Sequence, residues 1–139
     1  MKRLFLDTNI VLDFLLEREE WLQEAISILS LADQGEIEVF CSTLSLATAS
    51  FFMEKAKMPH DLLIKKLKGF CEICTPSPVD ADTVHMALQS SFADFEDALQ
   101  YYSALSCKAD VIITRNGKDF ANSKLPVRTA SEWIEETCY

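Results

Sequence analysis

The sequence predicts a three-layer α/β/α sandwich built around a central, mainly parallel β-sheet. Two observations support this fold class: short apolar runs alternate with helix-like segments along the 139-residue chain, and several of those runs end at a carboxylate. The hydrophobic content of 49%, together with only three Gly and four Pro, fits one compact core without linkers or repeats. We therefore expect residues 1–139 to form a single domain.

The first half of the chain is predicted to contain three strands and four helices. In order, these are strand 3–7, helix 9–16, helix 20–33, strand 36–41, helix 42–57, helix 59–68 and strand 70–75. Asn9 is a suitable cap for the first helix, and Gly35 is a typical signal for the end of the second. Pro59 separates the next two helices, and Pro76 and Pro78 are expected to close the third strand.

The second half continues the alternation. The predicted elements are helix 80–90, helix 94–107, strand 111–114, a short helical turn 118–121, strand 126–128 and a terminal helix from 131. Asp80 or Asp82, Asp94 and Ser131 are the candidate helix caps, and Asn116-Gly117 predicts a turn. Short strands separated by helices imply right-handed crossovers and a parallel sheet covered on both faces.

Cysteine usage and hydropathy indicate a cytoplasmic protein. The five cysteines are odd in number and scattered through apolar sequence, which favours reduced, buried thiols over disulfides. Cys71 and Cys74 form a C-x-x-C pair, but neither a second pair nor a nearby His completes a zinc set. Acidic and polar residues interrupt the N-terminal apolar run, so we expect neither a signal peptide nor a membrane span.

The net charge of −9 opposes non-specific binding to nucleic acids. A short lysine-rich stretch, from Lys55 to Lys68, is nevertheless a candidate basic surface, with a solvated helix face as the alternative. Carboxylates that hold divalent cations would account for part of the negative charge.

Carboxylates just past the ends of apolar runs are the strongest functional signal. Asp7 follows the first strand, and Asn116 and Asp119 follow the strand at 111–114. If these two parallel strands are adjacent, their carboxyl ends share a crevice of the kind in which α/β proteins bind ligands. Asp94 and Asp97 lie three residues apart and therefore share one helix face, with Asp94 favoured as cap and Asp97 as ligand. Such a group of acids suits a hard divalent cation.

Three motifs resemble the PIN domain family, which includes the toxin nucleases of bacterial toxin–antitoxin pairs. They are Leu4-Phe5-Leu6-Asp7-Thr8-Asn9, Asp94-Phe95-Glu96-Asp97-Ala98-Leu99, and Val111-Ile112-Ile113-Thr114-Arg115-Asn116-Gly117-Lys118-Asp119-Phe120. The motifs occur in the family's order, and the length of the chain fits the family's domain from end to end. The resemblance implies a five-stranded parallel sheet, a Mg²⁺ or Mn²⁺ site and metal-dependent endoribonuclease activity on RNA. It also implies a homodimer and an antitoxin protein as partner.

The same resemblance assigns roles to individual residues. Asp7, Asp97 and Asp119 match the family's catalytic, metal-binding acids. Asn9 and Thr114 match polar positions that support the site, and Asn116 lies beside them. Glu96 is about a quarter-turn away from Asp97, so we expect it to be peripheral.

One position departs from the family pattern. Family members commonly carry a Glu in the helix after the second strand, where this chain has Thr48. Glu54 lies six residues further on and should point elsewhere, whereas Asp13, one turn after Asn9, is a better substitute or else an exposed residue. Because carboxylate charge holds hard cations, we expect weaker metal binding, or a PIN-like interaction module without activity.

Other chemistries fit less well. His60 and His85 lie in segments without a partnered nucleophile, which argues against a Ser–His–Asp or Cys–His site. Phosphotransfer through an aspartyl intermediate at Asp7 would need a second nearby carboxylate, but Asn9 occupies that place.

Overall fold

The computed structural model describes residues 1–138, which form a sheet of five parallel strands with helices between them. The strands are β1 (Arg3–Leu6), β2 (Glu38–Ser42), β3 (Cys74–Ser77), β4 (Val111–Ile113) and β5 (Val127–Arg128). The helices are α1 (Thr8–Leu15), α2 (Leu22–Asp33), α3 (Thr43–Lys55), α4 (His60–Ile73), α5 (Ala81–Leu88), α6 (Phe95–Ser106) and α7 (Ala130–Cys138), with a 3₁₀ turn η1 (Gly117–Phe120).

The strand order is β3-β2-β1-β4-β5. The chain adds β2 and β3 on one side of β1, and then β4 and β5 on the other side. β1 pairs with β2 on one side, with Phe5 opposite Phe40, and with β4 on the other, with Phe5 opposite Ile112. The chain therefore winds outward twice from β1, and the predicted crevice between β1 and β4 lies at this switch point.

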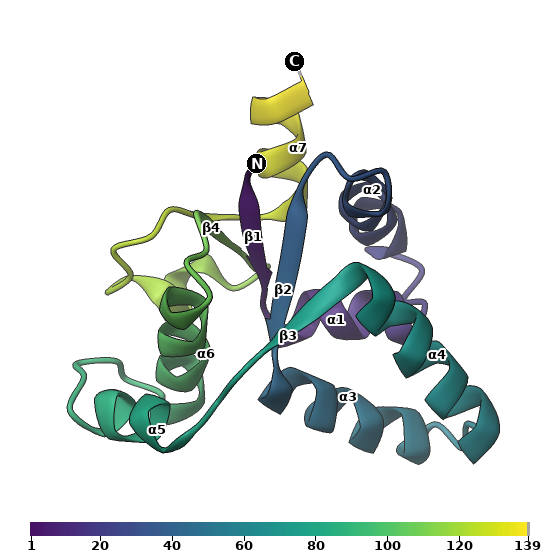
Figure 1. The fold of residues 1–139 in the computed structure, drawn as a ribbon, viewed down its shortest axis with the longest axis horizontal. Helices are drawn as coiled ribbons and strands as arrows, with labels where there is room; N and C mark the ends of the chain where they lie inside the picture. The colour runs from purple at the N-terminus through teal and green to yellow at the C-terminus, as the bar shows by residue number, and fades with distance from the viewer. Residues whose placement is uncertain (139) are drawn as a thin grey trace.

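Helices cover both faces of the sheet, which confirms the predicted three layers (Figure 1). Alternate strand residues point to opposite faces, so Leu4 and Leu6 join one core while Phe5 joins the other. The first core packs against α1, α2, α3, α4 and α7, and the second against α6 and η1. Among the described residues, no helix is long and apolar enough to span a membrane.

The largest difference from the predicted elements is at the third strand. α4 continues to Ile73, and β3 runs from Cys74 to Ser77, so the predicted strand at 70–75 begins too early. Phe70 is buried on the same side of α4 as Leu63, because the two residues are two helical turns apart. Pro76 lies inside β3, which is an edge strand and can accommodate a residue without an N–H group.

Two predicted caps are also wrong. α1 begins at Thr8 and is capped by Asp7, whose Oδ1 accepts the Thr8 N–H at 2.8 Å, so Asn9 lies inside the helix. α7 begins at Ala130 rather than at Ser131. Thr129 Oγ1 accepts the Glu132 N–H, while a Glu132 carboxylate oxygen accepts the Thr129 N–H. The sequence pattern T-x-x-E, from Thr129 to Glu132, is the signature of this reciprocal capping box.

The cysteines whose side chains the structure describes are free thiols, in agreement with the expected reduced state. Cys41 and Cys74 are buried, and Cys71 and Cys107 are half-buried. Burial is the largest cause of the raised pKa of Cys71 and Cys107, so neither is activated as a nucleophile. The side chain of Cys138 lies outside the described part.

Candidate functional site

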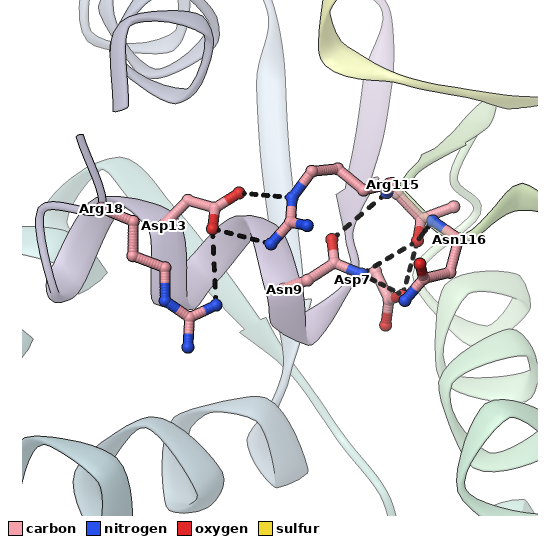
Figure 2. A network of polar contacts seen from close by, with 7 residues as sticks. Asp7, Asn9, Asp13, Arg18, Arg115 and Asn116 are labelled. Atoms are coloured by element: carbon pink, nitrogen blue, oxygen red, sulfur yellow. Dashed lines mark hydrogen bonds and ion pairs between the residues drawn. The ribbon is translucent and has the colours of Figure 1, made fainter. Parts of the chain in front are cut away.

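Asp7 lies at the carboxyl end of β1, next to β4. Its backbone N–H donates to the Ile113 carbonyl at 2.9 Å, so the pairing of β1 and β4 continues to the carboxylate itself. The side chain is 7% exposed. Thr114 Oγ1 donates to Asp7 Oδ2 at 2.7 Å, and Asn9 Nδ2 donates to the same oxygen at 3.3 Å (Figure 2). Asp7 is therefore fixed by hydrogen bonds to the end of β4, from its own backbone and from Thr114, and by Asn9 in the first turn of α1.

The environment of Asp7 disfavours its negative charge. Burial is the main cause of its raised pKa, and the charges of Asp119 and Glu96 raise it further. The hydrogen bonds from Thr114 and Thr8 act in the opposite direction and lower the pKa. An ion that neutralised this group would relieve both unfavourable effects.

The first turn of α6 contributes three more carboxylates, on Asp94, Glu96 and Asp97. Asp94 caps the helix, with Oδ1 accepting the Asp97 N–H at 3.0 Å. Asp97 is half-buried, and its pKa is raised to about 7 by desolvation and then by the charges of Asp94, Asp119, Asp7 and Glu96. The charges that raise the pKa of Asp97 therefore belong to acids from three separate segments, all of which line the same cleft.

The segment after β4 supplies the remaining polar groups. Thr114 is fully buried and accepts the Asn116 N–H at 3.0 Å, which fixes the turn that begins η1. The Asp119 N–H donates to the Asn116 carbonyl at 3.0 Å, so the position of Asp119 depends on that turn. Asn116 and Asp119 are exposed.

These segments line one open cleft of about 360 Å³. The cleft is lined by Asp7, Asp94, Glu96, Asp97, Asp119, Asn9, Asn116, Thr8, Gln100, Leu12, Thr48 and Phe52. The lining contains five carboxylates and no Lys, Arg or His. Every site residue predicted from the sequence lies here except Thr114, which is buried directly behind Asp7. Glu96 also lines the cleft, although the sequence indicated a peripheral position.

The part of the lining that comes from Leu12, Thr48 and Phe52 carries no charge. Leu12 belongs to α1, and Thr48 and Phe52 are one turn apart on α3. Thr48 thus lies in the cleft at the position where the sequence comparison expected a Glu. Because the Thr48 hydroxyl is neutral, α3 contributes no charged side chain to the cleft lining.

Asp13 does not replace the missing acid. It is 1% exposed and binds Arg115 through two 3.0 Å hydrogen bonds, so the expectation that it substitutes for the Glu, or is exposed, is wrong. Arg18 Nη1 lies 3.6 Å from Asp13 Oδ1 (Figure 2). Both arginines neutralise this carboxylate, which lies outside the cleft lining and lines a separate pocket together with Arg115.

A buried polar cluster behind the cleft was not predicted. Gln100 is 1% exposed, and its Nε2 donates to Thr8 Oγ1 at 2.6 Å and to Ser45 Oγ at 2.8 Å. Its Oε1 is buried and has no partner among the described residues. The only sequence signal was spacing, because Gln100 lies three residues after Asp97 and therefore shares its helix face.

The chemistry of the cleft fits a hard divalent cation, which carboxylate and amide oxygens bind well. Such an ion would stabilise the carboxylates with raised pKa values and the buried Gln100 carbonyl oxygen, which has no hydrogen-bond partner within residues 1–138. Within the described residues, no three His, Cys, Asp or Glu side chains are arranged to hold one ion together. Binding through the ion's own waters, or rotation of Asp97 and Asp119, would complete the ligand set.

The fold and the cleft at its switch point define an α/β protein with an acidic site. The sequence matches the model of the PIN domain family over residues 3–118, so the chain belongs to this family. PIN domains are generally nucleases. No curated protein sequence matches the chain.

Solved structures share the fold. VapBC2 from Rickettsia felis, bound to a DNA fragment from its promoter, has a chain with 18% identity and a TM-score of 0.66 that covers 91% of this chain and 98% of its own. A chain of FitAB bound to the IR36 DNA fragment has 16% identity and a TM-score of 0.67, covering 91% and 94%. PAE2754 from Pyrobaculum aerophilum has 13% identity and a TM-score of 0.58, covering 99% and 91%. At these identities, the similarity is one of fold.

Proposed function

We propose that this protein is a metal-dependent endoribonuclease that hydrolyses RNA phosphodiester bonds in the acidic cleft. The observation that carries the proposal is the meeting of Asp7, Asp97 and Asp119, from three separate segments, in a cleft whose lining has no basic side chain. Mg²⁺ or Mn²⁺ bound there would neutralise phosphate oxygens and lower the pKa of an attacking water.

The side chains of the cleft have two proposed roles, metal binding and the orientation of the metal ligands. Asp7, Asp97 and Asp119 provide the carboxylates that bind the metal, and Asp94 fixes the first turn of α6. Asn9 and Thr114 donate to Asp7 and hold its orientation, while Asn116 orients groups at the cleft edge. Hydrogen bonds of this kind set the geometry of metal ligands.

The direct test uses a fluorescent single-stranded RNA with Mn²⁺, Mg²⁺ or EDTA. The wild-type protein is expected to cleave with either metal and not with EDTA, and Asp7→Asn is expected to be inactive. Asp33→Asn removes an exposed acid at the end of α2 and serves as the matched control. The proposal fails if the wild type cleaves no RNA and calorimetry shows no difference in Mn²⁺ binding between wild type and Asp7→Asn.

The second candidate function is an interaction module that has lost catalysis. Thr48 favours it, because the cleft has a neutral wall at the place where the family commonly has a Glu. The two functions differ in metal binding: a melting temperature raised by Mn²⁺ supports the enzyme, and an unchanged one supports the module.

We also propose a toxin role with an antitoxin partner, which the family membership supports. The VapBC2 and FitAB structures are named for two-component assemblies, which supports a partner here. A groove of about 470 Å³ between α1, α2 and α4 offers half-buried apolar side chains, including Phe14, Ile26 and Ile73, to such a partner. Growth arrest on expression of the wild type, and not of Asp7→Asn, tests the toxin role.

We also expect a cytoplasmic homodimer. Phe51 on α3 is 58% exposed and Leu88 on α5 is 66% exposed, so both helices present large apolar side chains that a second copy could cover. Light scattering after gel filtration measures the mass of the assembly. Phe51→Glu is expected to shift it to the monomer.

A further inference from the structure

Arg115 occupies the junction between the cleft and the rest of the domain. It follows Thr114 at the end of β4 and precedes Asn116 and Asp119, yet its side chain turns away toward α1 (Figure 2). There, Nε donates to Asp13 Oδ2 and Nη2 donates to Asp13 Oδ1, each at 3.0 Å. The guanidinium also lies 3.6 Å from the centre of the Trp21 ring. This one side chain therefore ties the loop after β4 to α1 and to the start of α2.

The backbone of the same residue reaches the cleft. The Arg115 N–H donates to Asn9 Oδ1 at 3.3 Å, and Asn9 Nδ2 donates to Asp7 Oδ2 and to Thr114 Oγ1. Asn9 and Asp13 are one helical turn apart on α1. The loop is thus fixed to α1 at two successive turns, once through the Arg115 side chain and once through its backbone.

We propose that Arg115 is a positioning residue, which holds the Asn116–Asp119 segment against α1 so that Asp119 faces the carboxylates of Asp7 and Asp97. This inference rests on the proposed metal-dependent function. The Arg115 side chain does not line the cleft, and it acts through Asn9 and through the turn that carries Asp119.

A contribution to stability does not by itself account for the pairing of Asp13 with Arg115. Apolar side chains of similar volume can often replace a buried ion pair without loss of stability, whereas removal of one partner leaves an unpaired buried charge. Arg18 would remain as a more distant partner, 3.6 Å from Asp13. What an apolar pair cannot supply is the fixed direction of two parallel hydrogen bonds.

The double variant Asp13→Leu/Arg115→Met tests the positioning role of Arg115 separately from its effect on the stability of the protein. It removes both charges together, so we expect it to remain folded, with an unfolding midpoint near that of the wild type. Calorimetry is expected to show Mn²⁺ affinity reduced about tenfold, in the range typical of lost ligand support. Arg128→Met is the matched control, because it breaks an exposed ion pair with Glu136 by the same substitution.

A second measurement needs no metal. Hydrogen exchange of the Asn116 and Asp119 amides is expected to be at least several-fold faster in the double variant than in wild type and in Arg128→Met. Unchanged exchange together with unchanged Mn²⁺ affinity would overturn the inference. If the wild type itself binds no Mn²⁺, the proposed function fails, and the exchange rates alone decide whether Arg115 positions the segment.

Discussion

Thr114 Oγ1 donates a 2.7 Å hydrogen bond to Asp7 Oδ2, and so joins the ends of two adjacent parallel strands behind the cleft. The same hydroxyl accepts the Asn116 N–H at 3.0 Å and an Asn9 side-chain N–H at 3.2 Å. One buried oxygen therefore links β1, α1 and the loop that carries Asp119.

Thr114→Val keeps the shape of this side chain and removes its oxygen. Two donors and one acceptor lose a partner, so we expect the free energy of unfolding to fall by about 1–3 kcal/mol. The pKa of Asp7 should rise further, because the Thr114 hydrogen bond lowers it. Urea unfolding measures the first effect, and Mn²⁺ titrations at several pH values measure the second. Thr75→Val, at an exposed position on β3, should change neither.

The pH dependence of stability follows from Asp97. Its pKa of about 7 in the folded protein lies above the value near 4 of an unfolded Asp. The folded state therefore binds the extra proton between these two values, and Asp97 makes the metal-free protein less stable as pH rises from about 4 to about 7. Asp7, whose pKa is also raised, acts in the same direction. Asp97→Asn should flatten the profile measured by urea unfolding, and Asp33→Asn should leave it unchanged.

Metal binding should show the opposite dependence on pH. A cation requires the ionised carboxylate, so it must displace the Asp97 proton below about pH 7. We expect Mn²⁺ affinity to increase as pH rises toward 8, by up to about tenfold per unit below the pKa. Calorimetry in buffers of different ionisation enthalpy counts the released proton directly. Release of no proton at pH 6 would contradict this prediction.

The three-layer fold could be predicted from the sequence because the alternation of short apolar runs and helical segments indicates a parallel sheet covered by helices. The layers, the switch point and the meeting of Asp7 with Asp97 and Asp119 all depend on strand order, which short apolar runs and parallel crossovers restrict strongly. The start of β3 was misplaced because Phe70 and Cys71 suit either a strand or the last turns of a helix.

Contacts between residues far apart in the sequence could not be predicted from local patterns. Asp13 carries no local sign that Arg115, 102 residues later, neutralises it. The contacts of Gln100 with Thr8 and Ser45 are equally non-local, because they cross three helices. Spacing along one helix placed Asn9 and Asp13 one turn apart, but only tertiary packing decides which of the two faces the cleft.

The buried cluster around Ser45 allows a comparison of two substitutions. Ser45 Oγ contacts Gln100 Nε2, Thr8 Oγ1 and Ser42 Oγ, so Ser45→Ala should cost about 1–3 kcal/mol of unfolding free energy. Gln100→Met removes two donated bonds but also the carbonyl oxygen that has no partner, and should cost about 1 kcal/mol or less. Urea unfolding of both variants checks the order. A larger loss for Gln100→Met would show that its carbonyl has a bound partner in solution.

Thr48→Glu places a carboxylate on the uncharged wall of the cleft. With the metal absent, the new charge shares the cleft with Asp7 and Asp97, so the free energy of unfolding should fall at neutral pH. With Mn²⁺ present, an additional carboxylate oxygen should tighten binding about tenfold or more, and RNA cleavage should become faster at low metal concentration. Ala47→Glu adds the same charge at the neighbouring, exposed position of α3, about a quarter-turn away, and should not reproduce the gain. Equal Mn²⁺ affinities of Thr48→Glu and the wild type would show that Thr48 does not occupy a ligand position, and that three carboxylates complete the site.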